Sequence, residues 1–309
     1  MRIAVMGSGG MGGYFGGMLA RAGEDVHFIA RGAHLEAMQA SGLTIKTSKD
    51  GEFNIPVKAT DDPTDIGAVD LVLFCVKTYD TEEIANFIKP LIGPDTVVMS
   101  LQNGVDNEKI IESIIGPGHV IGAVAYVSAK IDSPGVISES LNQRIILGEL
   151  TRERTPRVEQ ITKAFEATGQ TIEVPDDIQV AIWSKLLSIT TMSAITCITR
   201  LPMGPIFACP ETRAMTRGFL VEGIAVARAN AITIPDALVD EFMGIFDTLP
   251  PTFRASMYHD LANGRRMELD DIIGVVVRLG EKLGVPTPLT FAAYASLKPY
   301  ANGTPATPS

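Results

Sequence analysis

The stretch Ile3-Ala4-Val5-Met6-Gly7-Ser8-Gly9-Gly10-Met11-Gly12 decides the fold of this chain. Its four apolar residues are typical of a buried strand, and a helical pattern follows the glycines to about Arg21. In a GxGxxG turn the first glycine permits the tight bend, the second lets the backbone approach a pyrophosphate, and the third packs helix against strand. The helix N-terminus then faces the phosphates. A purely structural turn is the alternative, but the position directly after a strand favours dinucleotide binding by Gly7, Ser8, Gly9, Gly10, Met11 and Gly12.

The first half of the chain repeats this alternation of strand and helix. Further short apolar runs, bounded by Gly, Asp or Pro and separated by segments of helix length, lie at Val26–Ala30, Leu71–Val76, Val97–Leu101 and Val120–Val127. Such alternation implies parallel βαβ units and hence a doubly wound sheet. The stretch Gly135–Glu149 has the pattern of a hairpin, and we expect it to extend the same sheet.

The second half of the chain has a different pattern. From Asp177 onward helical periodicity dominates, with breaks at Pro202, Pro210, Pro235, Pro250 and Pro286. We place the boundary after a short strand at Thr171–Val174, so that residues 1–174 form a dinucleotide-binding (Rossmann) domain and residues 175–309 a helical catalytic or substrate domain. The predicted fold class is therefore α/β: an N-terminal Rossmann-like doubly wound parallel sheet with a C-terminal all-helical domain. The tail after Tyr300 is expected to be frayed.

Composition limits the partners of this chain. The formal charge is −10, which repels nucleic acid and anionic membranes. Three scattered cysteines, Cys75, Cys197 and Cys209, provide neither a disulfide framework nor a zinc site, which suits a reducing cytoplasm. No window approaches the roughly 18 apolar residues of a membrane span, and the apolar run near Met1 is too short for a signal peptide. We expect a soluble, cytoplasmic protein without a metal site, whose four dispersed histidines are structural or face solvent.

The end of the second predicted strand bears on the choice between NAD and NADP. An NAD site usually has an acidic residue there, about 20 residues after the glycines, which holds the ribose hydroxyls. This chain instead has Arg31, while Glu24 and Asp25 come before the strand. A planar guanidinium can pair with a 2′-phosphate, so Arg31 favours NADPH, with an exposed loop arginine as the alternative.

Several short motifs follow one another along the rest of the chain. They are Val76-Lys77-Thr78-Tyr79 after one strand, Gln102-Asn103-Gly104 after the next, Trp183-Ser184-Lys185-Leu186 at the start of the helical half, and Ser256-Met257 twelve residues before Glu268-Leu269-Asp270. In this order and spacing they resemble the ketopantoate reductases (2-dehydropantoate 2-reductases). The resemblance covers nearly the whole chain.

The resemblance implies that NADPH reduces a 2-oxo acid to a 2-hydroxy acid, namely ketopantoate to pantoate in the pantothenate pathway. It implies that Lys185 is the general acid that protonates the ketone oxygen, and that Asn103 positions nicotinamide and substrate. It further implies that Ser256 binds the carboxylate, that Glu268 holds the substrate and tunes the lysine, and that Lys77 lines the cleft near the cofactor. Hydride addition builds negative charge on oxygen, so a positioned cation that donates a proton suits this chemistry. The alternatives are a surface lysine, a turn asparagine, an ordinary helix serine and a helix-capping glutamate.

The chain departs from the family pattern beside the predicted lysine. The family usually has asparagines four and eight residues after it, on the same face of the helix, where this chain has Ile189 and Ser193. A third family asparagine is replaced around Met203. These changes make the substrate pocket less polar and weaken its fit to the terminal hydroxyl of pantoate.

Two other functions therefore stay open. One is a D-2-hydroxy-acid dehydrogenase of the same superfamily that acts on a more apolar 2-oxo acid. The other is a non-catalytic module that senses NADPH, against which the joint presence of Lys185, Asn103 and Glu268 argues. The apolar segment Ile206–Val226 fits either a core or a dimer surface, so a homodimer is also open. The sequence fixes neither the substrate nor the stereochemistry of the product.

Overall fold

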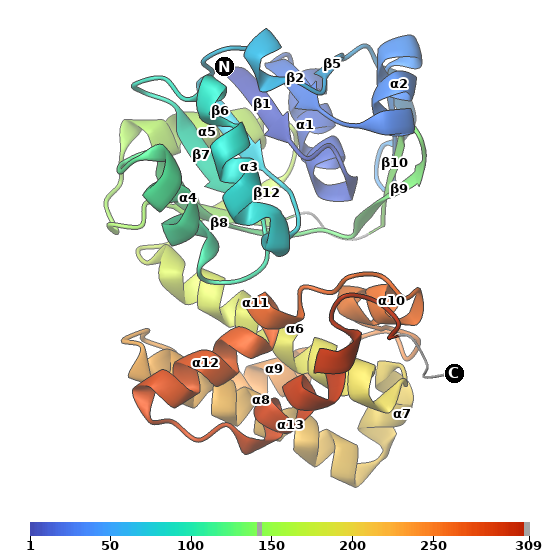
Figure 1. The fold of residues 1–309 in the computed structure, drawn as a ribbon, viewed down its shortest axis with the longest axis vertical. Coiled ribbons are helices and arrows are strands. Elements are labelled where there is room, and N and C mark those ends of the chain that lie inside the picture. The colour runs from blue at the N-terminus through green and yellow to red at the C-terminus, as the bar shows by residue number, and fades with distance from the viewer. Residues whose placement is uncertain (141–143, 306–309) are drawn as a thin grey trace. The chain divides into compact units, whose positions relative to one another are not determined.

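The computed structural model describes residues 1–140 and 144–305 and consists of two units. The first contains Met1–Gln102 and Asp106–Ala181, and the second contains Asn103–Val105 and the chain from Ile182 onward. The first unit is a mixture of strands and helices, and the second is helical (Figure 1). The predicted α/β fold class is confirmed.

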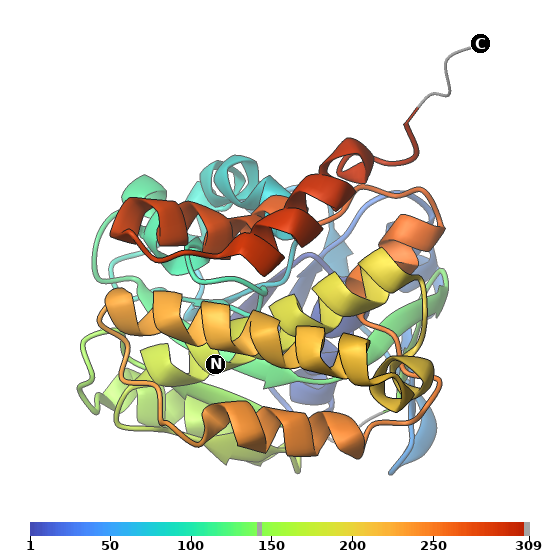
Figure 2. The same cartoon turned by 90° about the horizontal axis from the view of Figure 1, so that it is seen from below.

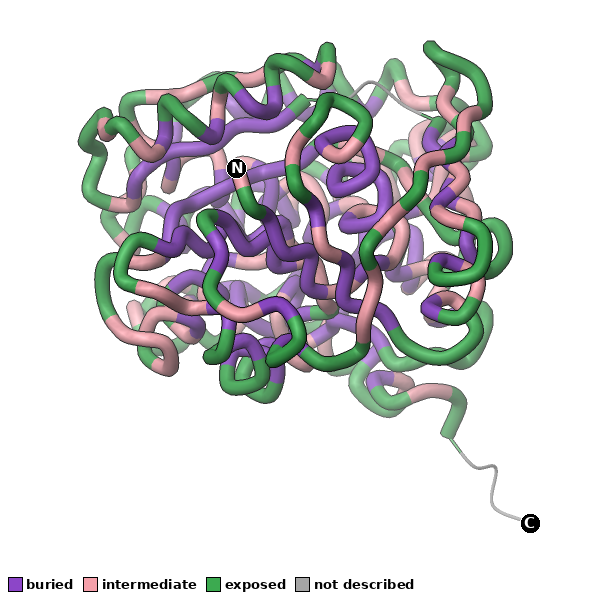
Figure 3. Tube along the Cα trace, turned by 90° about the horizontal axis from the view of Figure 1, so that it is seen from above, coloured by how far each residue is buried: buried purple, intermediate pink, exposed green. Residues whose placement is uncertain are grey.

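An eight-stranded sheet forms the centre of the first unit. Its order is β12-β11-β8-β7-β6-β1-β2-β5, and all neighbouring strands are parallel except β8 and β11, which are antiparallel. The bounds are β1 (Arg2–Met6), β2 (Asp25–Ile29), β5 (Lys58–Thr60), β6 (Leu71–Phe74), β7 (Val97–Ser100), β8 (Val120–Tyr126), β11 (Arg144–Gly148) and β12 (Thr171–Glu173). The central strands are buried on both faces, as parallel strands covered by helices must be (Figure 3).

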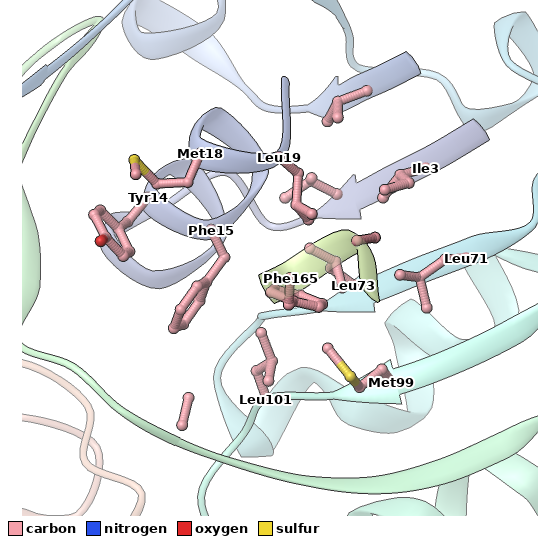
Figure 4. Packing of buried hydrophobic residues seen from close by; sticks show 14 of the residues in the cluster. Ile3, Tyr14, Phe15, Met18, Leu19, Leu71, Leu73, Met99, Leu101 and Phe165 are labelled. Atoms are coloured by element: carbon pink, nitrogen blue, oxygen red, sulfur yellow. The ribbon is translucent and has the colours of Figure 1, made fainter. Parts of the chain in front are cut away.

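Successive side chains of a strand point to opposite faces of the sheet, and this divides the core of the first unit into two clusters. Ile3 and Val5 face the side covered by α1 (Gly10–Arg21), α2 (Gly32–Ser41) and α5 (Pro156–Glu166). Ala4 and Met6 face α3 (Thr81–Phe87) and α4 (Asn107–Ile115) on the other side. On the first side Phe15 of α1 meets Phe165 of α5 edge to face, at 6.1 Å between ring centres (Figure 4).

A second, four-stranded sheet lies against α1, and it corrects one prediction. Its order is β4-β3-β10-β9, with bounds β3 (Leu43–Thr47), β4 (Gly51–Ile55), β9 (Ala129–Ser133) and β10 (Val136–Glu139). The predicted hairpin at Gly135–Glu149 is wrong, because β10 joins this sheet whereas β11 pairs with β8 in the larger one. The burial patterns explain the separation: four of five β11 residues are buried, as in a central strand, while β10 alternates as a strand with one covered face does.

Helix α1 forms although five of its twelve residues are glycines, each of which costs roughly 0.5–1 kcal/mol relative to alanine. Close packing on two sides explains this composition. A Cβ on Gly12 or Gly16 would stand 2.9 or 2.6 Å from Val5 of the large sheet. A Cβ on Gly13 or Gly17 would stand 2.9 or 2.2 Å from side chains of the small sheet. Because glycine has no Cβ, the backbone of the helix can pack closely against both sheets.

The second unit is a packed set of helices. They are the larger part of α6 (Ile178–Thr199), then α7 (Met203–Ala208), α8 (Pro210–Ala229), α9 (Leu238–Asp247), α10 (Ser256–Ala262), α11 (Leu269–Ile272), α12 (Gly274–Leu283) and α13 (Pro288–Leu297). Helix α8 packs against α9 on one side and against α12 and α13 on the other (Figure 2). Its buried residues include Phe219, Leu220 and Ile224, so much of the apolar segment Ile206–Val226 is core.

Two smaller expectations are also corrected. Helix α6 is long and apolar enough for a membrane span by length and composition, with a mean hydropathy of 1.4, although 67% of that window is buried inside the protein. A core helix meets the same test, because burial against other helices selects the same apolar residues as lipid does. The segment after Tyr300 is not frayed at its start: Ala301 accepts a hydrogen bond from the Met267 N–H at 2.9 Å, and Asn302 bridges to Arg266. Residues 306–309 lie outside the described part.

Candidate active site

The glycine-rich turn joins β1 to α1 in the first unit. Gly7 has a φ of +93°, a conformation that favours glycine, and a Cβ on Gly12 would stand 2.2 Å from the Gly7 carbonyl oxygen. At Gly9 the space is open, since a Cβ there would meet nothing within 4 Å. The N-terminus of α1 begins at the next residue, Gly10. An open space beside a helix N-terminus suits the oxygens of a phosphate group.

Arg31 follows β2 directly and is the residue before the first turn of α2. Its side chain is exposed, and it forms no ion pair within residues 1–140 and 144–305. Asp25 stands at the opposite end of the same strand, where Lys58 and His27 contact its carboxylate at 2.6 and 3.2 Å. No acidic side chain of β2 therefore lies at the end where an NAD site needs one.

The two motifs after β6 and β7 occupy the turns that follow these strands. Lys77 is exposed and precedes a short 3-10 turn, while Asn103 is half-buried and belongs to the second unit. Gln102 holds the chain just before Asn103, since its amide donates to Thr81 Oγ1 at 2.9 Å and its carbonyl accepts from Ser100 Oγ at 3.1 Å. Gly104 follows with a φ of +110°, a backbone conformation that favours glycine. Asn103 is thus placed by a fixed turn.

Lys185 and Glu268 are both buried in the second unit, at 9% and 7% exposure. Burial lowers the pKa of Lys185 to about 8, and the negative charge of Glu268 opposes that shift. The elements that carry them are tied together, because Thr190 Oγ1 of α6 donates to the Ile272 carbonyl of α11 at 2.7 Å. The structure therefore brings together a lysine that titrates near neutrality and a carboxylate that favours its charged form.

The segment that carries Glu268 is held from several directions. The Met267 N–H bonds to Ala301 on one side of it. On the other side the Asp270 carboxylate accepts hydrogen bonds from Tyr294 Oη at 2.6 Å and Lys298 Nζ at 2.5 Å. Although burial opposes ionisation, these bonds hold the pKa of Asp270 below its usual range. The chain on both sides of Glu268 is thus held in place.

The remaining predicted residues also belong to the second unit. Ser256 is exposed at the first position of α10. On α6, one and two turns beyond Lys185, Ile189 is half-buried and Ser193 is buried. Sequence reasoning missed Arg254, whose guanidinium lies 5.1 Å from the Tyr258 ring centre and whose Nε is buried with no partner in the described part of the chain. Its position two residues before Ser256 was the available signal.

The fold combines a Rossmann-like unit with a helical unit, and the comparisons with known proteins identify the chain as an oxidoreductase. Two family models match the chain: "Ketopantoate reductase PanE/ApbA" over residues 3–152 and "Ketopantoate reductase PanE/ApbA C terminal" over residues 177–301. A 2-dehydropantoate 2-reductase of Mesorhizobium japonicum is 33% identical and aligns over 96% of this chain and 97% of its own length. This chain belongs to the ketopantoate reductase family.

Solved structures agree with this assignment. The crystal structure of a PanE/ApbA family ketopantoate reductase from Ralstonia eutropha has a TM-score of 0.90 at 34% identity and covers 97% of this chain and 98% of its own. A ternary structure of D-mandelate dehydrogenase with NADH and anilino(oxo)acetate has a TM-score of 0.89 at 25% identity, covering 97% of this chain and 98% of its own. The second match shows that the same fold also serves a dehydrogenase for an aromatic 2-hydroxy acid.

Proposed function

We propose that this chain reduces a 2-oxo acid to a 2-hydroxy acid with NADPH, and that the reaction is ketopantoate to pantoate in the pantothenate pathway. The observation that carries the proposal is the buried Lys185, whose pKa of about 8 lies close to neutral pH, beside the charge of Glu268. A general acid works best when its pKa is near the working pH. The names of the relatives supply the substrate class.

The residues divide the work between the two units. We place the cofactor on residues 1–174, with Gly7–Gly12 against its pyrophosphate, Arg31 against its 2′-phosphate and Lys77 nearby. When bound, the nicotinamide supplies hydride. Residues 175–309 supply the acid: Lys185 donates the proton to the ketone oxygen, and Glu268 maintains the lysine charge. Asn103, from the turn after β7, orients the reactants. Ser256 and Arg254 offer donors to the carboxylate.

The pH dependence of turnover tests the role of Lys185. Reduction needs the protonated lysine, so kcat/KM should be level below about pH 8 and fall roughly tenfold per unit well above it. The Glu268 charge raises this pKa, so Glu268→Gln should move the fall to lower pH. A profile that stays level to pH 10, or an unmoved fall in the variant, contradicts the assignment.

Arg31 should make the enzyme prefer NADPH. We expect NADPH to bind at least about tenfold more tightly than NADH, because a guanidinium gains a charge-assisted bidentate contact with the 2′-phosphate. Arg31→Asp should narrow or reverse the preference, measured by fluorescence titration of both cofactors. Arg278→Ala, in the helical unit, serves as a control that should leave the ratio unchanged. Equal or tighter NADH binding by the unaltered protein rules out this role.

A comparison of several 2-oxo acids as substrates decides between a ketopantoate reductase and a D-2-hydroxy-acid dehydrogenase that acts on a more apolar acid. Ile189 and Ser193 remove two amides from the wall beyond Lys185, and each additional buried methylene of a substrate gains about 0.8 kcal/mol. We expect 2-oxoisovalerate or phenylglyoxylate to rival ketopantoate in kcat/KM, and Ile189→Asn/Ser193→Asn to favour ketopantoate. The D-mandelate dehydrogenase likeness supports including an aromatic acid. A preference for ketopantoate above about 10²-fold identifies an ordinary ketopantoate reductase, and inertness toward every 2-oxo acid contradicts the function.

The cellular setting is part of the same proposal. Cys75, Cys197 and Cys209 are all free thiols, which suits the cytoplasm. The partner is a small-molecule 2-oxo acid rather than nucleic acid or a membrane, given the charge of −10. A homodimer stays a prediction.

A further inference from the structure

The loop of residues 103–106 connects β7 to α4 and carries Asn103, and we call it the Asn103 loop. Residues Asn103–Val105 belong to the second unit, whereas Gln102 before them and Asp106 after them belong to the first. The chain therefore leaves the first unit at Gln102 and returns to it at Asp106. The place of Asn103 depends on how the two ends of this loop are held.

A single hydroxyl of α3 contacts the chain at both ends of the Asn103 loop. At the start of the loop Gln102 Nε2 donates to Thr81 Oγ1 at 2.9 Å. At its end Thr81 Oγ1 lies 3.4 Å from Oδ1 of Asn107, the first residue of α4. Thr81 and Asn107 are both buried, so bulk water does not compete for these contacts. Thr81 thus closes the base of the loop.

The same hydroxyl is fixed to the turn after β6, which comprises residues 77–80 and is here named the Lys77 turn. Thr81 follows this turn as the first residue of α3, and its Oγ1 donates to the Thr78 carbonyl at 2.7 Å. Because a hydroxyl has one proton, this short bond leaves Oγ1 as the acceptor for Gln102. The Lys77 turn and the base of the Asn103 loop therefore share one oxygen atom.

The amide of Gln102 is also held at its other end. Its Oε1 accepts from Oγ of Ser100 at 3.1 Å, and Ser100 is the fully buried last residue of β7. A chain of hydrogen bonds thus runs from the end of β7 through Gln102 and Thr81 to the Lys77 turn. Connected buried hydrogen bonds of this kind make a structure rigid. Removing the Thr81 oxygen would take away both the acceptor of Gln102 and a donor to Thr78.

We propose that Thr81 is a positioning residue for the reaction: its hydroxyl ties the base of the Asn103 loop to the Lys77 turn and so sets the place of Asn103. The inference rests on the proposed function, because it assumes that Asn103 orients the reactants. Thr81 acts through Asn103 and takes no direct part in proton transfer.

Two substitutions at Thr81 separate the hydroxyl from the shape of the side chain. Thr81→Val keeps the branched shape and removes the oxygen, whereas Thr81→Ser keeps the oxygen and removes a methyl group. Gln102→Met removes the amide that reaches Thr81, and the double variant Thr81→Val/Gln102→Met completes a double-mutant cycle. The matched control is Thr96→Val, just before the start of β7. Thr96 is as buried as Thr81, and its Oγ1 donates to the Val69 carbonyl at 2.6 Å.

The readouts in the full-length protein are kcat, the dissociation constant of NADPH, the melting temperature, and the isotope effect with NADPH deuterated at the transferred position. We expect Thr81→Val and Gln102→Met to lower kcat about tenfold to a hundredfold, because a small misplacement of an orienting group has effects of this size. The isotope effect should rise as hydride transfer becomes slower, and NADPH binding should stay within about threefold. Thr81→Ser should stay within about threefold of the unaltered protein in kcat. Thr96→Val should lower the melting temperature and leave kcat and the isotope effect unchanged.

The outcomes separate the inference from the function on which it rests. The double variant should lose no more activity than the more damaging single variant, because both changes break the same bond. Where the unaltered protein reduces a 2-oxo acid, any of four results overturns the positioning role alone: normal kcat in Thr81→Val, an equal loss in Thr81→Ser, an equal loss in Thr96→Val, or losses that multiply in the double variant. If the unaltered protein reduces no 2-oxo acid, the proposed function fails and the positioning role fails with it.

Discussion

Replacing Lys185 with alanine should lower kcat by at least about 10², the lower range for the loss of a general acid. The lysine is buried and titrates near pH 8, so water is a poor substitute for it as a proton donor at that point. NADPH affinity should change less than about threefold, because the glycine-rich turn and Arg31 belong to the other unit. Stopped-flow measurement of NADPH oxidation with the best 2-oxo acid gives kcat, and fluorescence titration gives the affinity.

Two further variants make this result specific. Lys185→Met keeps the aliphatic length and the packing but removes the ammonium, so it should lose as much activity as Lys185→Ala. Lys282→Ala removes an exposed lysine of α12 and should be neutral. If Lys185→Met retained near-normal turnover, the proton would come from another group.

Gly9→Ala should weaken NADPH binding by about tenfold to a hundredfold while leaving the melting temperature within about 2 °C. The protein itself accommodates the added methyl, since a Cβ at Gly9 meets nothing within 4 Å and its φ of −70° is accessible to alanine. The methyl would instead occupy the space that we assign to the pyrophosphate, and a forced steric overlap costs about 1–3 kcal/mol.

The neighbouring glycine provides the contrast. In Gly12→Ala the new Cβ would stand 2.2 Å from the Gly7 carbonyl oxygen, so this variant should lose stability as well as binding. Gly244→Ala adds a methyl to open space in α9 and controls for the substitution itself. Tight NADPH binding by Gly9→Ala, measured by calorimetry, would show that the cofactor does not approach this residue.

The strands of the larger sheet are largely predictable from sequence, because burial on both faces produces short continuous apolar runs. The runs at Leu71–Val76 and Val97–Leu101 became β6 and β7. The small sheet was not predicted, although Asp50-Gly51 between two alternating runs is a hairpin signal. The partners of β10 and β11 could not be read either, because local pattern identifies a strand but leaves its neighbour undetermined.

The sequence likewise predicted some features of the candidate site and not others. Motif order indicated Lys185 and Glu268, and the structure adds their burial and their electrostatic coupling. The contact of His34 had no signal in the sequence, because its partner Gly135 lies 101 residues further along the chain. A residue that acts by connecting distant segments shows no local pattern, and only the folded chain shows what it touches.

The glycines of α1 have a consequence for engineering this scaffold. Gly13 and Gly17 bring the backbone of the helix close to Ile137 and Ile45 of the small sheet, which cover this face. Trimming the chain to a minimal nucleotide-binding module by deleting β3, β4, β9 and β10 would leave that face bare. Such a truncation should aggregate even if every residue proposed to bind the cofactor were retained. The small sheet is therefore an integral wall of the domain, and attempts to change cofactor preference have more freedom around Arg31, where the surface is exposed.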